Sequence, residues 1–318
     1  MGLGCAGIGG PFLNKDGSVN GYGQVNDKNS IEAIRIALDM GITYYDTADI
    51  YGCGRSERVL GEALSSQRDD VIIATKFGNT WDELSTNSLI PCRSIGTDTS
   101  SKAILESCLG SLKRLGRNYI DVFELHLGNH PVSSTGLAMD ALEDLVDEGL
   151  IRYYGWSTNN PKHANVFANR KRFTVVQFRH NLLSRNDYML TSVVKEFDVA
   201  GIIKGPLGYG LFTGKYDSTS VLPIDHVWYG NDFSKGSLAN VLSILDEAKK
   251  ILTSDGRTLS QGAIAWIWSQ GTQLIPIPGF KTAQQVVENV QAMDFGQLKR
   301  CQIVELERIL EHRCDLWS

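Results

Sequence analysis

The chain has no apolar run long enough to span a bilayer, and its first residues lack the charged and then hydrophobic pattern of a signal peptide. It also has no stripe of basic residues interleaved with aromatic ones, and its formal net charge is -5 at pH 7. These absences argue against both a membrane and nucleic acid as partners. We therefore expect a cytoplasmic protein that binds small molecules.

Cysteine is scarce and scattered. The six cysteines form no C-x-x-C pair and have no histidine nearby at ligand spacing; they are Cys5, Cys53, Cys92, Cys108, Cys301 and Cys314. In a chain of 318 residues this distribution predicts reduced, intracellular thiols, without a disulfide framework or a zinc site. We expect no metal.

The segment GLGCAG at residues 2–7 has the G-x-G-x-x-G spacing of a dinucleotide-binding turn. In that turn a strand leads into the glycines, and a helix begins among them so that its N-terminus faces the pyrophosphate. Only Met1 precedes these glycines, and Gly9, Gly10 and Pro11 follow where the helix should lengthen. The segment therefore favours a glycine-rich first strand that runs into a loop.

Short runs rich in Val, Ile, Phe and Tyr recur along the chain and are typical of strands buried on both faces. They lie at 42–46, 71–76, 119–126, 151–157, 174–178, 199–204 and 273–278. Segments with helical periodicity separate most of them, and several end at a glycine that can cap a helix. We expect helices at 30–40, 101–115, 137–148, 237–254, 259–269 and 296–313.

With residues 2–7 as the first strand, the count reaches eight strands. Their alternation with helices predicts a parallel sheet, and eight strands predict a closed (β/α)8 TIM barrel of the α/β class. Such barrels average about 250 residues, so the remainder supplies two extra helices and long loops on the carboxyl-terminal face. No linker or low-complexity tract divides the chain, and we expect a single domain over residues 1–318.

Four side chains that handle protons meet at one rim of this barrel. The functional face of a parallel barrel lies at the carboxyl ends of its strands, and three neighbouring strands there end in Asp46, Lys76 and His126. Tyr51 lies in the loop after Asp46, within reach of the same rim. A free phenol has a pKa of about 10. A nearby ammonium would lower it, and Asp46 would keep Lys76 charged and aimed.

This set suits the reduction of a carbonyl, in which a phenol supplies the proton and His126 orients the carbonyl or shares the transfer. Taken singly, Asp46 and Lys76 fit a structural ion pair, and His126 fits a hydrogen-bonded rim histidine. The four together on consecutive strands favour the acid–base site.

Several motifs, in order along the chain, resemble those of the aldo-keto reductase family. They are DTADIYGCGRSERVLGEAL (46–64), ATKFG (74–78), SLKRLGRNYIDVFELH (111–126), GPLGYGLFTGKY (205–216) and IPGFKTAQQVVENVQA (277–292). The resemblance implies that Tyr51 is the general acid, that Lys76 and Asp46 tune it, and that His126 positions the carbonyl. It also implies a nicotinamide cofactor across the carboxyl-terminal face, with NADPH preferred over NADH.

The resemblance assigns residues to each part of this cofactor. Ser157 and Gln177 match the positions that bind the carboxamide, and either Thr158 or Asn159 replaces the usual asparagine. The 205–216 loop and the segment after the last strand supply Pro206, Leu207, Gly210, Lys215, Gly279, Lys281, Thr282, Gln285, Glu288 and Asn289. Lys281, beside a helix that begins near residue 282, either meets the 2′-phosphate of NADP or is a solvated surface lysine.

Lys204 departs from the family pattern, because an aromatic residue, commonly tyrosine, often stacks on the nicotinamide at this position. A lysine cannot stack as a ring does, and its charge would bias the nearby potential. Substrate identity is expected in the loops at 9–26 and 77–100 and in the long loop within 205–272, whose aromatic residues Tyr22, Trp81 and Trp228 either wall a pocket or anchor the loops on the barrel.

Together these features predict the reversible, NADPH-dependent reduction of an aldehyde or ketone to an alcohol. Two alternatives stay open: a regulatory barrel that senses NADP(H), and a redox-neutral enzyme that uses tightly bound NADP on a biosynthetic intermediate. The physiological substrate and the oligomeric state are not predicted.

Overall fold

The computed structural model describes residues 1–66, 70–84, 88–184 and 188–310. Its centre is a sheet of eight strands in the order β1-β4-β5-β8-β9-β10-β11-β12, each parallel to its neighbour. The strands are β1 (Leu3–Gly4), β4 (Tyr44–Asp46), β5 (Ile72–Phe77), β8 (Ile120–Leu125), β9 (Ile151–Ser157), β10 (Phe173–Arg179), β11 (Ala200–Lys204) and β12 (Leu274–Pro276). The expected strands are therefore present in the expected order.

The sheet closes on itself where the first strand meets the last. The Gly4 N–H donates to the Pro278 carbonyl oxygen at 3.0 Å, and Gly4 forms a parallel bridge with Gly279. A Cβ atom at Gly4 would lie 2.9 Å from the Ile277 carbonyl oxygen, so glycine is required for this close approach. The predicted (β/α)8 barrel is confirmed.

The G-x-G-x-x-G segment serves this closure. Strand β1 is followed by the one-turn helix α1 (Ala6–Gly9), where the sequence predicted a loop. A Cβ atom at Gly7 would lie 2.6 Å from the Phe280 carbonyl oxygen. The glycines therefore let the ends of the first and last strands approach each other, and they belong to a barrel and not to a Rossmann unit.

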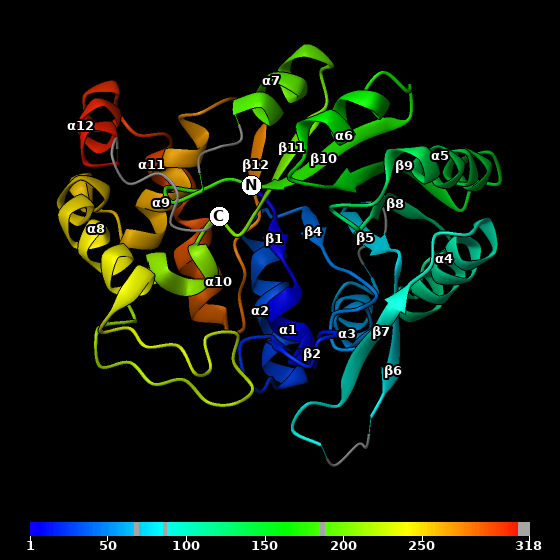
Figure 1. Ribbon diagram of the computed structural model, residues 1–318, viewed down its shortest axis with the longest axis horizontal. Coiled ribbons are helices and arrows are strands. Elements are labelled where there is room, and N and C mark those ends of the chain that lie inside the picture. Colours follow the sequence, from blue (N-terminus) through cyan, green and yellow to red (C-terminus); the bar gives the residue numbers. More distant parts are fainter. Residues whose placement is uncertain (67–69, 85–87, 185–187, 311–318) are drawn as a thin grey trace.

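Helices surround the barrel (Figure 1). They are α2 (Asp27–Asp39), α3 (Arg55–Ala63), α4 (Ser101–Leu115), α5 (Val132–Asp147), α6 (Pro161–Phe167), α7 (Tyr188–Glu196), α9 (Leu259–Trp268), α10 (Ala283–Val290) and α11 (Ala292–Phe295). The two extra helices, α8 (Gly236–Leu252) and α12 (Arg300–Leu310), pack against each other at the outside. The last helix was expected over 296–313, of which residues 311–313 lie outside the described residues.

Side chains that alternate along the strands fill the barrel in layers. One apolar layer consists of Tyr44, Ala74, Val122, Val175, Ile202 and Ile277. Two residues further along four of these strands, a polar layer follows with Asp46, Lys76, Glu124 and Lys204. Because side chains on one face of a strand recur at every second residue, both layers face the interior. The apolar layer therefore closes the barrel beneath its polar carboxyl-terminal end.

A second sheet replaces part of the expected loops. Its order is β3-β2-β7-β6, with β2 (Phe12–Leu13), β3 (Val19–Asn20), β6 (Asn79–Glu83) and β7 (Cys92–Thr97). The β6–β7 hairpin extends away from the barrel (Figure 1). The expectation of loops over 9–26 and 77–100 is therefore wrong in part, because the backbone of each segment pairs with itself as a hairpin, and Leu13 and Arg93 join the two hairpins.

Cys53 and Cys92 form a disulfide, with Cα atoms 6.0 Å apart. The prediction of reduced thiols is wrong for this pair, because the fold brings together two residues that are 39 positions apart. Cys5, Cys108 and Cys301 are free, and Cys314 lies outside the described residues. The cysteines therefore do not indicate a reducing compartment.

Within the described ranges, no helix is long and apolar enough to cross a membrane. Nor do three or more His, Cys, Asp or Glu side chains in these ranges form a group that could hold a metal ion.

Candidate active site

Asp46 and Lys76 form a buried ion pair at the carboxyl-terminal end of the barrel. They end or nearly end the neighbouring strands β4 and β5, so their side chains rise from the same layer. The Lys76 Nζ atom donates to Asp46 Oδ1 at 2.8 Å and Oδ2 at 2.7 Å, and to the Thr47 carbonyl oxygen at 2.6 Å. Burial alone would lower the pKa of Lys76, but Asp46 raises it above its ordinary value. Lys76 is therefore a fixed cation.

Tyr51 lies in the loop after β4 and is held against this pair. The Lys76 Nζ atom is 5.3 Å from the centroid of the Tyr51 ring, and the His126 ring meets the same ring edge-on with centroids 5.7 Å apart. A Cβ atom at Gly52 would overlap the Gly9 carbonyl oxygen, and the φ of Gly52 is +60°. The turn after Tyr51 therefore requires glycine to place the phenol at the barrel mouth.

The protonation states of Tyr51 and His126 follow from burial. Burial raises the pKa of the Tyr51 phenol to about 12, although Lys76 acts in the opposite direction. The expectation that Lys76 would bring this pKa below its ordinary value is therefore wrong, because loss of hydration outweighs the attraction of the cation. Burial, with Lys76 and Lys204 nearby, holds the pKa of His126 well below its ordinary value. At neutral pH the phenol is protonated and the imidazole is neutral.

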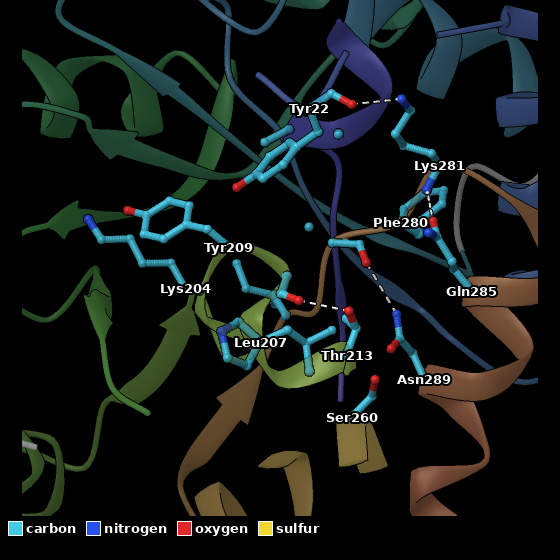
Figure 2. Close-up of a pocket in the computed structure, with 18 of the residues that line it drawn as sticks. Tyr22, Lys204, Leu207, Tyr209, Thr213, Ser260, Phe280, Lys281, Gln285 and Asn289 are labelled. Atoms are coloured by element: carbon cyan, nitrogen blue, oxygen red, sulfur yellow. Dashed lines mark hydrogen bonds between the residues drawn. The ribbon is translucent and has the colours of Figure 1, made fainter. Parts of the chain in front are cut away.

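A cleft opens across the carboxyl-terminal face above these residues. Of the predicted site residues, those that line it are Tyr22, Asp46, Tyr51, Gln177, Lys204, Pro206, Leu207, Gly210, Lys215, Gly279, Lys281, Gln285, Glu288 and Asn289. Figure 2 shows Lys204, Leu207 and Tyr209 on one side and Lys281, Gln285 and Asn289 on the other. The fold thus brings most of the predicted residues to one elongated site.

The residues predicted to meet a carboxamide are linked by hydrogen bonds. The Ser157 hydroxyl donates to Gln177 Oε1 at 3.2 Å, and Gln177 Nε2 donates to Asp46 Oδ2 at 2.7 Å. Thr158 and Asn159 bind backbone: the Thr158 hydroxyl donates to the Gly128 carbonyl oxygen at 2.7 Å, and Asn159 Oδ1 accepts from the Arg179 N–H at 2.9 Å. Gln177 therefore bonds directly to the ion pair, and Ser157 connects to the pair through Gln177.

The opposite end of the cleft is rich in cations. Lys215 and Lys281 line it, and burial lowers the pKa of both. The Lys281 Nζ atom donates to the Tyr22 carbonyl oxygen at 2.8 Å. Thr282 caps helix α10 by accepting from the Gln285 N–H at 3.3 Å, so the positive end of that helix points toward the same region. This end of the cleft can hold an anionic group.

Two loops meet beside this end of the cleft. The Gly23 N–H donates to the Asp225 carbonyl oxygen at 3.0 Å, and the Val227 N–H donates to the Gly21 carbonyl oxygen at 2.8 Å. Gln24 Nε2 adds a bond to Asp225 Oδ2 at 2.8 Å. The segment after β3 and the long segment before α8 are therefore bonded to each other next to Lys281.

The three loop aromatics lie in different places. Tyr22 lines the cleft, whereas Trp81 and Trp228 are not among the lining residues. The Trp228 indole is buried, and its Nε1 donates to the Tyr209 carbonyl oxygen at 3.0 Å. Trp81, like Tyr51, packs against the apolar cluster that contains the disulfide.

Sequence reasoning missed Glu124 and Tyr209. Glu124 lies in the polar layer, is fully buried, and has no hydrogen-bond partner for either carboxyl oxygen among the described residues. Burial raises its pKa to about 8. Tyr209 lines the cleft, and its hydroxyl accepts from Arg179 at 2.6 Å. The alternation Val122, Glu124 along β8 was the available signal for the buried carboxyl.

The fold and site define a (β/α)8 barrel with a buried Asp–Lys pair, a tyrosine and a histidine beside its cleft. A model of the Aldo/keto reductase family matches residues 2–311, and the chain belongs to this family. It is therefore an oxidoreductase whose family reduces small-molecule carbonyl compounds.

Relatives from several organisms are similar over most of the chain. The uncharacterized oxidoreductase YqkF of Bacillus subtilis is 28% identical over 96% of this chain and 91% of its own. The aldo-keto reductase yakc [NADP(+)] of Schizosaccharomyces pombe is 29% identical over 87% and 80%, and the NADH-specific methylglyoxal reductase of Escherichia coli is 28% identical over 93% and 90%.

Among solved structures, the glycerol dehydrogenase AKR11B4 of Gluconobacter oxydans superposes with a TM-score of 0.81. It is 26% identical, with 98% of this chain and 91% of that chain covered.

Proposed function

We propose that the protein catalyses the reversible, NADPH-dependent reduction of an aldehyde or ketone to an alcohol, with Tyr51 as the general acid. The observation that carries this proposal is the buried Asp46–Lys76 pair beneath a protonated phenol at the end of the cleft. A general acid must be protonated before the carbonyl is reduced, and a pKa of about 12 leaves Tyr51 protonated at neutral pH.

The cleft fits a dinucleotide in shape and in charge. At the cationic end of the cleft, the phosphates would be held by Lys215, Lys281 and the start of α10. At the other end, the carboxamide would be held by Ser157 and Gln177. When bound, the reduced nicotinamide supplies the hydride that the carbonyl carbon accepts.

The residues of this chain carry out the proton transfers. Tyr51 donates its proton to the carbonyl oxygen as negative charge develops there. The Lys76 ammonium stabilises the phenolate that remains, and Asp46 keeps that ammonium in place. His126, being neutral, can donate one hydrogen bond from a ring N–H to orient the carbonyl, and its buried Nδ1 has no partner among the described residues.

The cofactor preference is part of the proposal. Relatives include both a yeast protein named for NADP(+) and a bacterial reductase named as NADH-specific, so family membership leaves the choice open. We favour NADPH because Lys281 lies on the cleft wall beside the N-terminus of α10, where a 2′-phosphate would find a cation and a helix end.

The test combines binding with turnover. We expect the wild type to bind NADPH in a fluorescence titration and to oxidise it with at least one carbonyl of a panel of aliphatic, aromatic and sugar aldehydes and ketones. Tyr51→Phe should lower kcat by about 100-fold or more, the usual contribution of a general acid, and should leave the Kd of NADPH nearly unchanged. Tyr153→Phe, which removes an exposed phenol on β9, is the matched control.

Two results would contradict the proposal. Tight NADPH binding without turnover of any carbonyl would favour a nicotinamide-sensing barrel. Loss of both binding and turnover in Tyr51→Phe would indicate a structural role for this residue.

A further inference from the structure

Lys204 is a cation held against the part of the cleft that we assign to the nicotinamide. It ends strand β11, where it pairs in register with Arg179 of β10, and its side chain lines the cleft. Figure 2 shows it on the wall opposite Lys281 and Asn289. Lys204 is therefore far from the cationic end that suits phosphates, and it needs a different explanation.

Hydrogen bonds fix the position of this ammonium. The Lys204 Nζ atom donates to the Ser157 hydroxyl at 2.8 Å. Through Ser157 and Gln177 it connects to Asp46, so a continuous chain of hydrogen bonds runs from Lys204 to the Asp46–Lys76 pair. Ser157 and Gln177 are the residues proposed to bind the carboxamide. The charge on Lys204 is therefore anchored to the groups that would hold the nicotinamide.

No carboxylate of the described residues forms an ion pair with Lys204, although two acidic groups lie in the same layer. Asp46 is engaged by Lys76. Glu124 has no hydrogen-bond partner for its carboxyl oxygens within the described part of the chain, and a pKa of about 8 leaves it neutral at pH 7. Burial lowers the pKa of Lys204 to about 8, which leaves its ammonium protonated at pH 7, so this positive charge is not cancelled nearby.

We propose that Lys204 makes the site discriminate between the two redox states of its nicotinamide, binding NADPH more tightly than NADP⁺. This inference rests on the proposed function. The oxidised ring carries a positive charge and the reduced ring is neutral, so an uncompensated ammonium beside the carboxamide repels only the oxidised form. A tyrosine at this position would stack on both forms without this charge penalty.

Two consequences follow for turnover. Weak binding of NADP⁺ speeds its release after a carbonyl has been reduced. On the protein, the balance between bound substrates and bound products shifts toward NADPH and the carbonyl compound, so Lys204 also favours the oxidation of a bound alcohol. Both effects come from one differential affinity.

The experiment measures the ratio of the Kd of NADP⁺ to that of NADPH, by calorimetry and fluorescence titration at pH 7. Three variants are compared with the wild type: Lys204→Met, which removes the charge; Lys204→Arg, which keeps it; and Lys215→Met, which removes a cation from the other end of the cleft. We expect Lys204→Met to lower the ratio at least tenfold, and a tenfold change corresponds to about 30 mV in the potential of a bound two-electron couple.

We expect the other two variants to keep the ratio within about threefold of the wild type, because Lys204→Arg retains the charge and Lys215→Met weakens both nucleotides alike. Thermal unfolding checks that each variant is folded. If Lys204→Met does not fold, Lys204→Gln is used in its place.

An unchanged ratio in Lys204→Met would overturn this proposal while leaving the proposed function intact. A rise in KM confined to carbonyl compounds that carry a carboxylate, with the ratio unchanged, would also overturn it and would place Lys204 in the substrate site. Failure of the wild type to bind either nucleotide would overturn the proposed function and this inference together.

Discussion

The Lys76 ammonium lies 2.7 Å from the Asp46 carboxylate, and the two side chains are 0% and 4% exposed. Such a pair is a poor source of stability, because removing two charges from water costs about as much as their attraction returns. Its members nevertheless depend on each other, since either one alone would be a buried, unpaired charge. We therefore interpret the pair as the means by which a fixed cation is placed below Tyr51, and not as a source of stability for the barrel.

Asp46→Asn should destabilise the protein by about 3–5 kcal/mol, the usual cost of leaving a buried charge without its partner. Urea unfolding measures this change. Asp82→Asn is the control, because it breaks an exposed pair with Arg93 and should cost about 0–1 kcal/mol. A cost for Asp46→Asn as small as that of the control would contradict the interpretation of Lys76 as a charged, dependent partner.

Glu124→Gln should make stability less sensitive to pH. The native pKa of Glu124 is raised from its ordinary value of 4.5 to about 8, so between these values the native state binds a proton that the unfolded state has lost. The stability due to this group is complete below pH 4.5 and decreases as the pH rises to 8, by about 1.4 kcal/mol per unit. Glutamine is isosteric and does not titrate.

The difference in unfolding free energy between Glu124→Gln and wild type, measured in urea at several pH values, isolates this effect from the titration of His126. As the pH rises across this window, the free energy of unfolding of Glu124→Gln should increase relative to that of the wild type. Parallel stability curves would show that Glu124 does not retain its proton. Asp46, Lys76 and Lys204 face the same layer and are common to both proteins.

Reduction of the Cys53–Cys92 disulfide should lower the free energy of unfolding by about 2–4 kcal/mol, because the bond limits the freedom of the unfolded chain. Urea unfolding with and without dithiothreitol measures the loss. The double variant Cys53→Ser/Cys92→Ser should match the reduced protein and should not respond to the reductant. Alkylation of both cysteines in the native protein before any reduction would contradict the disulfide.

Lys281→Met should weaken the binding of NADPH about ten- to 100-fold, since a hydrogen bond to a charged group contributes about 1.5–3 kcal/mol. The Kd of NADH should change little, because NADH has no 2′-phosphate. Lys215→Met serves as the comparison: it should weaken both nucleotides. Equal weakening of NADPH and NADH by Lys281→Met would refute the assignment of Lys281 to the 2′-phosphate.

Much of the barrel could be read from local patterns. Strand β9 spans the residues expected for it, Ile151–Ser157, and α4 spans Ser101–Leu115 with Ser100 and Gly116 at its caps, because apolar periodicity and capping residues are local properties. The short strand β1 and helix α1 were harder to predict, because glycine carries no periodic signal. The second sheet was missed because its two hairpins have short strands without clear apolar alternation, and because the Leu13–Arg93 pairing that joins them is distant in sequence.

The sequence by itself determined which side chains reach the barrel mouth: Asp46 and Lys76 end neighbouring strands, and a parallel sheet carries both to the same rim. Only the tertiary structure decided the protonation states and the bonding partners of the residues at the site. The pKa of Tyr51 is raised to about 12 by the burial of its phenol, Cys53 meets Cys92 through the packing of a hairpin, and Lys204 bonds to Ser157 across an intervening strand. Hydration, proximity and unbalanced charge depend on neighbours that lie far apart along the chain, so no local pattern encodes them.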